Sequence, residues 1–585
     1  MKFITLAVLF SDLEATPKRL EMIDILSTFF GNIKKNKNFK DLDKIIYLLQ
    51  GQLVSNIKQF PKIGLAEKMI IEALSLHSGI GKKKIKEVLI KIGDIGATAE
   101  SILTKKKKQK SLFDFEDKPS ELESLLKISE LYSALQKIAL SKGAGSQDVK
   151  LGILRGLMSK SSPLEIKYLL RIITSTLRVG VSTLTIIDGL ALGFTGVKKN
   201  REYIEKAYNL HPDLGDITII LAENGIEEVK KINISYGVPI RSMLASRVPY
   251  GGIIEKTGSP LIAEYKLDGE RLQIHKQGDN VLLFSRRLLE ISKQYPDVCQ
   301  IIRENLKVSN AIIEGEIVAM DAFYEKMLPF QVLSKRRRKY DVEDVLKEVP
   351  VSLFLFDLLK IEDESYIEKP FLERRKKLEE IVKERDEIHL VKSVLINTTE
   401  ELLDIFNEAR NNGTEGIIAK SIKEDSTYQA GNRGFLWIKL KGLEGGKLSD
   451  TLDCVIIGGI YGRGRRKGVY SAYILAVYDP EDDSFKAFTR VASGWTDEIL
   501  ENLMKEMSLY EVDKKPNDVM CNDKPDQWFQ PEVVIEIMGD EITISDKFPS
   551  LGFSLRFPVF LRFRPEKAQK DITTVDEIKD LYKSQ

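Results

Sequence analysis

Apolar side chains in roughly the first 230 residues recur at intervals of three and four positions. The spacing holds over residues 20–26, 65–76, 122–140 and 164–177, and it places the apolar groups on one face of a helix. Gly-containing turns beside Lys or Arg interrupt the pattern at residues 79–81, 143–146 and 178–182. We therefore predict an all-α domain over residues 1–232. Its turns are either ordinary helix ends or phosphate-binding sites for duplex DNA.

The pattern changes after residue 239. Short alternating or β-rich segments follow at residues 261–265, 281–285, 311–319, 351–356 and 416–420, separated by turns and helical stretches. Such mixed periodicity is typical of an α+β domain, which we place at residues 233–442.

From residue 450 onward, strand-like segments at 454–460, 470–478 and 533–538 alternate with loops rich in Gly, Lys and Arg. This pattern predicts a small β-barrel of the OB-fold type over residues 443–585. The basic loop at residues 461–468 is either a phosphate-binding hairpin tip or a solubilising turn.

Composition narrows the range of functions. A chain of 585 residues is too long for one hydrophobic core. Its 89 Lys and Arg nearly balance 87 Asp and Glu, so attraction to nucleic acid must come from local clusters. Three scattered cysteines exclude a disulfide framework and a C-x-x-C zinc pair, which favours a reducing, intracellular setting. The sequence shows neither a signal-peptide cleavage site nor a membrane-spanning run, so we expect no membrane association.

Residues 264–271 read EYKLDGER, which places Lys266 in a tight turn. A lysine amine is nucleophilic only when neutral, and lowering its pKa from about 10.4 to 7 or 8 takes about 4 kcal/mol from desolvation and nearby cations. Gly269 would let the backbone turn and approach a ligand, and Arg271 offers a planar fork for phosphate. Taken alone, the octapeptide is equally compatible with a surface lysine in a hairpin.

Later segments supply other parts that an adenylating site needs. Such a site requires a platform for the base, carboxylates for metal or ribose, and cations for the α-phosphate. Candidates follow in chain order at the ends of predicted strands: Arg286, Glu316, Phe356, Glu415, and the pair Lys439 and Lys441 on one strand face.

The octapeptide resembles the K-x-D-G-x-R motif of covalent nucleotidyltransferases. The order and spacing of the other segments resemble, over essentially the whole chain, the motif series of ATP-dependent DNA ligases of the archaeal and eukaryotic replicative type. This resemblance implies that Lys266 forms the covalent AMP adduct. It also implies the following binding roles: Glu264 for the adenine amino group, Phe356 for adenine stacking, Arg271 and Arg286 for ribose or phosphate, Glu316 for ribose or metal, Glu415 for metal, and Arg433, Lys439 and Lys441 for the α-phosphate.

Near the C-terminus, residues 556–567 resemble the last ligase motif, which usually ends R-x-D-K. Arg564 and Lys567 would then orient the pyrophosphate. Glu566 stands where the family has Asp.

The same resemblance implies an enzyme that uses ATP as AMP donor and Mg²⁺ as metal. It would seal nicks in duplex DNA during replication, repair and recombination, through lysyl-AMP and then a DNA-adenylate. We expect a monomer that grips the phosphate backbone with little base readout, and an intracellular location in a prokaryote, most consistent with an archaeon.

Residues 109–115 read QKSLFDF and resemble the Q-x-x-L-x-x-F peptide that docks on replication sliding clamps. Gln109, Leu112 and Phe115 would make that contact. A short helix-packing segment is the alternative.

Three other functions remain open at this stage. An RNA ligase or capping guanylyltransferase shares the lysine turn, although the long helical domain speaks against it. An NAD-consuming ligase would need a four-cysteine zinc module that this chain cannot build. A DNA- or clamp-binding scaffold with a vestigial site is the non-catalytic alternative.

Overall fold

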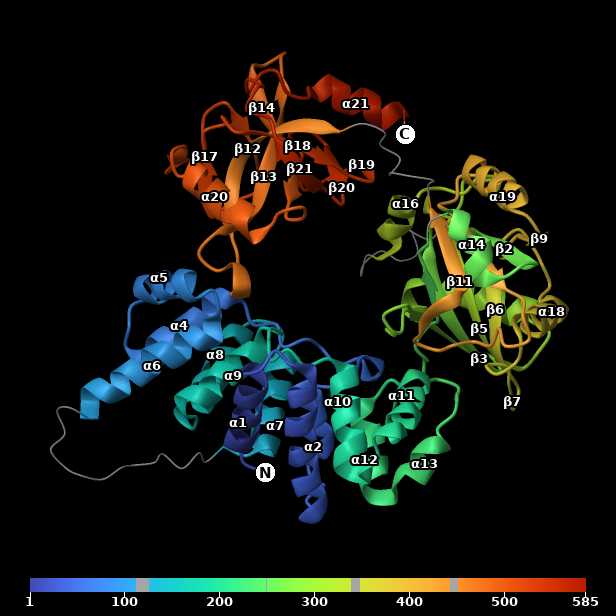
Figure 1. Cartoon of the computed structure of the whole chain (residues 1–585), viewed down its shortest axis with the longest axis horizontal. Helices are drawn as coiled ribbons and strands as arrows, with labels where there is room; N and C mark the ends of the chain where they lie inside the picture. The colour runs from blue at the N-terminus through green and yellow to red at the C-terminus, as the bar shows by residue number, and fades with distance from the viewer. Residues whose placement is uncertain (112–125, 249, 338–347, 442–450, 585) are drawn as a thin grey trace. The chain divides into compact units, whose positions relative to one another are not determined.

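The structure is a computed structural model that describes residues 1–111, 126–248, 250–337, 348–441 and 451–584 (Figure 1). It divides into two compact units. Unit 1 comprises Met1–Leu65 and Glu121–Leu443, and unit 2 comprises Ala66–Ser120 and Glu444–Gln585. The domain boundaries after residues 232 and 442 stay predictions.

Helices fill the N-terminal part of unit 1, as the sequence pattern predicts. They are α1 (Phe3–Glu14), α2 (Arg19–Lys35), α3 (Leu42–Leu49), α7 (Ile128–Leu140), α8 (Ser146–Ser159), α9 (Pro163–Ile173), α10 (Thr183–Leu190), α11 (Arg201–Leu210), α12 (Leu214–Asn224) and α13 (Ile226–Lys230). The predicted turns at 143–146 and 178–182 are confirmed. The helical stretch predicted to run to residue 177 was wrong at its end, because α9 stops at Ile173 and the backbone turns left-handed at Ser175 (φ +54°) and Arg178 (φ +55°).

Two sheets form the rest of unit 1. The first has the order β1-β11-β10-β2-β9 and the second β4-β3-β5-β6-β7, with β8 beside β6. The strands are β1 (Leu244–Ser246), β2 (Leu261–Lys266), β3 (Glu270–Gln277), β4 (Asn280–Ser285), β5 (Asn310–Ala319), β6 (Val351–Ile361), β7 (Glu364–Ser365), β8 (Ile388–Leu390), β9 (Ser393–Ile396), β10 (Gly416–Ser421) and β11 (Arg433–Lys441). The predicted strands are all present.

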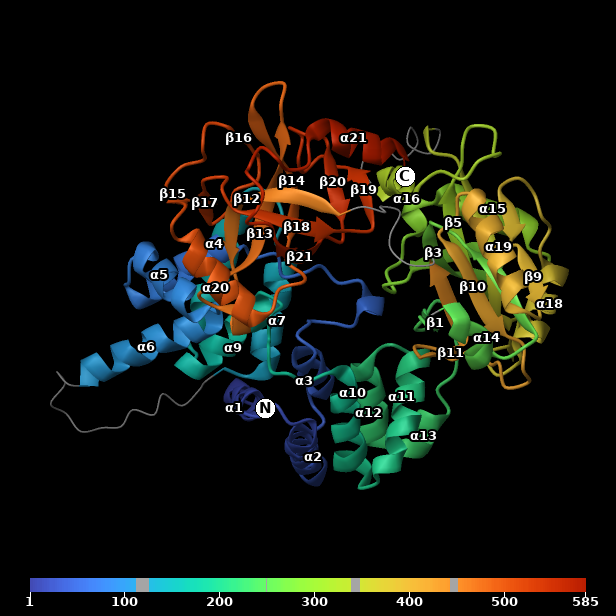
Figure 2. The same cartoon turned by 45° about the horizontal axis from the view of Figure 1, so that its top comes forward.

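Helices complete both layers: α14 (Ile253–Thr257), α15 (Pro296–Asn305), α16 (Phe330–Ser334), α18 (Phe371–Ile381) and α19 (Thr399–Asn411). Helix α18 packs on β6. Helix α19 packs on the first sheet, beside β9 and β10, as Figure 2 shows. Alternate residues of β2 and β10, such as Ala263 and Ile417, are buried in the core that α19 covers. Intervening residues therefore point to the opposite face of the first sheet.

Unit 2 combines three helices with the C-terminal β-domain. The helices are α4 (Glu67–Ser78), α5 (Lys82–Ile92) and α6 (Ile95–Ser111), followed after residue 443 by α20 (Asp497–Met507) and α21 (Val575–Ser584). The strands are β12 (Leu452–Tyr461), β13 (Tyr470–Asp479), β14 (Ser484–Val491), β15 (Glu511–Val512), β16 (Val519–Met520), β17 (Gln527–Phe529), β18 (Val534–Met538), β19 (Glu541–Ile544), β20 (Phe553–Arg556) and β21 (Val559–Phe563).

Strands β12, β13 and β14 form an antiparallel meander, and β18 closes back onto β12 and β21. This is the β-rich architecture predicted for an OB-type domain. In the basic loop, Arg465 and Arg466 both pair with Asp497 at the start of α20. Phosphate binding by that loop stays a prediction.

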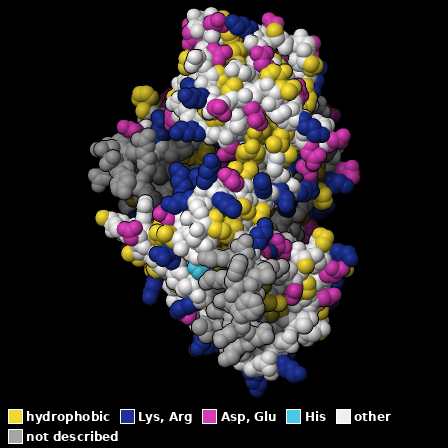
Figure 3. All heavy atoms as spheres, turned by 90° about the vertical axis from the view of Figure 1, so that its left-hand side faces the viewer, with side chains coloured by type: hydrophobic (Ala, Val, Ile, Leu, Met, Phe, Trp, Pro, Cys, Tyr) yellow, Lys and Arg dark blue, Asp and Glu magenta, His cyan; other side chains and the backbone are white. Residues whose placement is uncertain are grey.

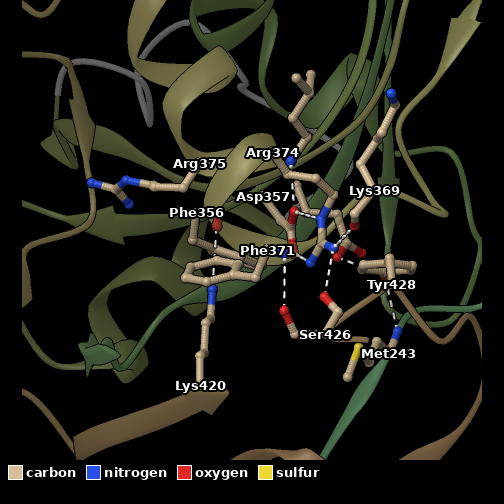
Figure 4. A network of polar contacts seen from close by, with 12 residues as sticks. Met243, Phe356, Asp357, Lys369, Phe371, Arg374, Arg375, Lys420, Ser426 and Tyr428 are labelled. Carbon is tan, nitrogen blue, oxygen red and sulfur yellow. Dashed lines mark hydrogen bonds and ion pairs between the residues drawn. The ribbon is translucent and has the colours of Figure 1, made fainter. Parts of the chain in front are cut away.

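A buried polar network fastens α18 to the second sheet (Figure 4). Arg374 on α18 is fully buried and donates to both carboxylate oxygens of Asp357 on β6, at 2.7 and 3.0 Å. Its remaining N–H groups reach the carbonyl oxygens of Lys369 and Ser426 at 2.7 and 3.0 Å. Arg374 thus makes four hydrogen bonds, and such supporting bonds make a buried charge pair tolerable.

We expect Asp357→Asn to destabilise unit 1 by about 3–5 kcal/mol, because the substitution leaves the Arg374 charge buried without a counterion. The measurement is calorimetric unfolding, in which the transition of unit 1 should move to a clearly lower temperature. Lys377→Ala removes an exposed ion pair with Glu380 on the same helix and serves as the matched control. Equal melting temperatures for Asp357→Asn and the wild type would contradict this reading of the network.

Candidate active site

The register of the first sheet aligns the candidate residues in rows on the face opposite α19. Lys266 lies opposite Gly416, and Gly416 opposite Lys441. In the next row on this face, Glu264 lies opposite Ile418, and Ile418 opposite Lys439. The structure thus brings together residues that are up to 177 positions apart in the chain, on a surface built by three adjacent strands.

Lys266 is paired with Glu415, which precedes β10. Its Nζ atom lies 2.7 Å from Glu415 Oε2, and the Lys441 ammonium contacts the same oxygen. Burial favours the neutral form of Glu415, but Lys266 and Lys441 outweigh it and lower the pKa of this carboxyl group. Glu415 is therefore an anion that holds two lysines at the end of the sheet.

Four predicted cations lie around a fifth, Lys439. Burial lowers the pKa of Lys439, and repulsion from Lys441, Arg433, Lys266 and Arg286 lowers it further. Such a concentration of like charge is unfavourable unless an anion occupies it. The positive charge of this cluster suits the binding of an anion.

Glu316 on β5 faces the same site. It accepts a hydrogen bond from the Gly269 N–H at 3.3 Å. Burial raises its pKa to about 7, against the lowering effects of Lys266 and Arg271 and in the same direction as Glu415. The two carboxylates are thus close enough to repel each other, and together they form an oxygen-donor pair.

A neighbouring strand leaves no room for a side chain at position 269. A Cβ at this position would lie 2.2 Å from the carbonyl oxygen of Ile317 on β5. The sequence predicts that this glycine allows a turn and the close approach of a ligand, and it does lie in the bend between β2 and β3. Its φ is not among the positive values of the chain, so the close approach is to β5, and it places Lys266 beside Glu316.

Arg271 is held by protein groups on two of its three nitrogens. Its Nη2 lies 2.6 Å from Glu314 Oε2 and its Nη1 donates to the carbonyl of Met243 at 2.9 Å. The guanidinium also lies 5.2 Å from the ring centre of Phe356. Within the described residues its Nε–H has no hydrogen-bond partner.

Glu264 lies in a buried cluster of charges and rings. Lys420 Nζ is 2.5 Å from its Oε2, and Arg375 Nη1 is 3.4 Å from its Oε1. The Lys420 ammonium is also 5.1, 4.6 and 4.5 Å from the ring centres of Phe356, Phe371 and Trp437. Figure 4 shows Lys420 pointing toward Phe356, whose carbonyl accepts its hydrogen bond at 3.2 Å.

Sequence reasoning missed several residues of this region. Lys420 and Trp437 pair with each other across β10 and β11 on the face of Lys439, so strand alternation could have found them. Arg375 comes from α18 and carries no local signal, because its partner Glu264 is 111 positions away.

The residues predicted from the last motif lie in unit 2. Arg564 Nη1 and Lys567 Nζ hold the two oxygens of Asp453, at 2.8 and 2.6 Å. Glu566, which replaces the usual Asp, pairs with Arg564 Nε at 2.6 Å. Of the predicted clamp-binding residues, Gln109 belongs to helix α6, whereas Leu112 and Phe115 lie outside the described residues.

Comparison with known proteins decides the family. Residues 242–441 match the family model of the ATP dependent DNA ligase domain, residues 2–191 that of the DNA ligase N terminus, and residues 466–567 that of the ATP dependent DNA ligase C terminal region. The chain belongs to the ATP-dependent DNA ligases. As an enzyme of this family, the ligase seals nicks in duplex DNA through an adenylate intermediate, with ATP as AMP donor and Mg²⁺ as cofactor.

Curated relatives extend over the full length of the ligase. The DNA ligase of Sulfurisphaera tokodaii is 42% identical, covering 100% of this chain and 98% of its own. That of Sulfolobus acidocaldarius is 43% identical with the same coverage. A solved structure named "Pmar-Lig_Pre" has a TM-score of 0.58 at 18% identity, over 96% of this chain and 99% of its own, and shows the shared fold. Among the described residues of the ligase, no helix has the length and apolarity to cross a membrane.

We expect Glu316 to exchange its proton near neutral pH, with a pKa of about 7. Difference infrared spectroscopy of wild type against Glu316→Gln should resolve a protonated carboxyl band that disappears between pH 6 and 8. Lys266→Met should move this transition to higher pH, because it removes a cation that favours the carboxylate. Glu415→Gln should move it to lower pH, because it removes a competing anion. Shifts of the same sign in both variants would contradict the described electrostatics.

Proposed function

We propose that Lys266 is the nucleophile that attacks the α-phosphate of ATP and carries the AMP. The supporting observation is its position beside Glu415, on the sheet face that also holds Arg433, Lys439 and Lys441. In the reaction, the N–P bond forms as the bond to pyrophosphate breaks, and Lys266 gives up one proton. An in-line attack depends chiefly on positioning, and the ion pair with Glu415 holds the Lys266 amine at the end of the sheet.

Phosphate recognition is assigned to the cation cluster. Arg433, Lys439 and Lys441 neutralise the α-phosphate as charge develops on its oxygens, and Arg286 contacts phosphate or ribose. The lowered pKa of Lys439 supports this assignment, because an incoming phosphate would relieve the repulsion that causes it.

Nucleoside recognition is assigned to the residues on either side of Phe356. Phe356 stacks on the adenine, Glu264 accepts a hydrogen bond from its amino group, and Arg271 contacts the ribose or phosphate.

Magnesium fits the carboxylates of Glu316 and Glu415. Among the described residues, no group of three or more His, Cys, Asp or Glu could hold a metal ion. Two carboxylates suffice for Mg²⁺, which completes its shell with substrate phosphates and water. When bound, the ion supplies charge neutralisation at the phosphates. Glu316 must be ionised to hold it.

In unit 2, we assign Arg564 and Lys567 to the orientation of pyrophosphate, with Glu566 positioning Arg564 as the usual Asp would. After self-adenylation, AMP passes to the 5′-phosphate of a nick, and the adjacent 3′-hydroxyl displaces it. Because a nick is a feature of the backbone, binding should depend on phosphates and on salt. Figure 3 shows Lys and Arg interspersed with Asp and Glu on one face, in keeping with the balanced net charge.

We expect Lys266→Ala to abolish transfer of label from α-labelled ATP to the protein and to reduce nick sealing by at least about 10³-fold, the scale lost with a covalent nucleophile. Lys392→Ala removes another ion-paired lysine of unit 1 and is the control. Mass spectrometry of wild type incubated with ATP and Mg²⁺ should place the AMP on the peptide containing Lys266. Sealing by Lys266→Ala at the wild-type rate would reject the assignment, and label from GTP or NAD but not ATP would favour the alternative nucleotidyltransferases.

We also propose that the ligase acts as an intracellular monomer and docks on a sliding clamp through Gln109, Leu112 and Phe115. The sequence match supports docking on the clamp. The three buried cysteines are all free, which is in keeping with a reducing, intracellular setting.

We expect Leu112→Ala/Phe115→Ala to lose stimulation of ligation by the clamp while keeping the basal rate, because the two apolar side chains would fill a pocket on the partner. The measurement is nick sealing with and without the clamp of the same organism. Unchanged stimulation would mean that residues 109–115 do not bind it.

A further inference from the structure

Arg375 contacts the proposed adenine-binding residue Glu264, but none of the roles assigned above includes it. It lies on α18, outside the sheet that carries the nucleophile, and its side chain is 11% exposed. Its three nitrogens have different partners: Nε donates to Glu379 at 2.8 Å, Nη2 to the carbonyl of Val391 at 3.0 Å, and Nη1 to Glu264 at 3.4 Å. Arg375 is therefore anchored at two points while it presents one N–H to Glu264.

Opposing influences act on the charge of Glu264. Its side chain is 3% exposed, and burial raises its pKa. The charged groups that face it are Lys420 on β10 and Arg375 on α18, which favour the carboxylate, and Asp357 on β6, which disfavours it. Lys420 is itself fully buried among aromatic rings, and burial lowers its pKa. Arg375 is thus the partner whose positive charge is permanent.

The protonation state of Glu264 determines what it can recognise. A carboxylate offers only acceptors and suits a purine with an amino group at position 6. A protonated carboxyl offers one O–H donor and suits a purine with an oxygen there. A buried polar site discriminates strongly between such isosteres, because a mismatched group is left unpaired.

We infer that Arg375, together with Lys420, keeps Glu264 ionised, and that this charge balance makes the ligase prefer 6-amino over 6-oxo purine triphosphates as donor. The inference rests on the proposed contact between Glu264 and the adenine amino group. A residue of α18 would thus influence which nucleotide donor the ligase prefers.

The test compares self-adenylation with ATP and with inosine triphosphate, in wild type and Arg375→Gln, between pH 6 and 8. The readout is the ratio of kcat/KM for the two donors. Effects common to both donors, including the titration of Glu316, cancel in this ratio. In the wild type, the ratio should favour ATP throughout.

In Arg375→Gln we expect the ratio to fall at least tenfold at pH 7 and to fall further toward pH 6. The sign follows because a carboxyl whose pKa has risen binds its proton as pH drops, and then donates to the 6-oxo group. The loss for ATP should appear mainly in KM, since base contacts are made in the ground state as well.

Two further variants separate charge from structure. Arg375→Lys retains a cation and should recover most of the preference. Glu379→Gln removes the outer anchor, which is half-exposed, and leaves both cations on Glu264, so its ratio should match the wild type.

A wild-type ratio in Arg375→Gln at all pH values would overturn the inference. An equal loss for both donors, unrelieved in Arg375→Lys, would do the same and would assign Arg375 a structural role. Failure of the underlying function is read separately, from whether peptide mapping of the wild-type adduct finds the AMP on Lys266.

Discussion

The adenylation site depends on the opposition of two effects: burial disfavours charged side chains, while neighbouring charges of opposite sign stabilise them. Cations gathered at the end of one sheet repel each other, and in the free protein the Glu415 carboxylate holds Lys266 and Lys441 together. This arrangement is stable without a ligand, yet it leaves Lys439 with a lowered pKa and therefore with a preference for an added anion. The proposed nucleophile and its proposed phosphate-binding partners are thus held together in the free protein, which would reduce the reorganisation that catalysis requires.

The buried residues behind the site differ, because their charges are paired within the protein. Arg374 and Asp357 are fully buried and satisfy each other, and Tyr428 donates to the buried Glu314 that holds Arg271. These groups have no spare hydrogen-bonding capacity for a ligand. Their role is to fix α18, β5 and β6, and so the rings and carboxylates that line the nucleotide-binding face.

How much the sequence predicts depends on how local the signal is. Helices, strands and the lysine turn follow from periodicity and from a short motif, so they were found with small errors such as the early end of α9. The convergence of Lys266 with Lys439 and Lys441 needed only strand alternation and motif order. The steric reason for a glycine at position 269 could not be found from the sequence, because its neighbour is a carbonyl on β5 that no local pattern reveals. Arg375 was not identified for the same reason, because its partner Glu264 is distant in sequence and only folding brings the two together.

The division of the chain into units has a topological consequence. The polypeptide passes from unit 1 to unit 2 after residue 65, returns after residue 120, and passes over again after residue 443. Three covalent crossings therefore tether the units, so a single cut in one connection would leave two others intact. Each unit then stays at high effective concentration relative to the other even if one connection is cut.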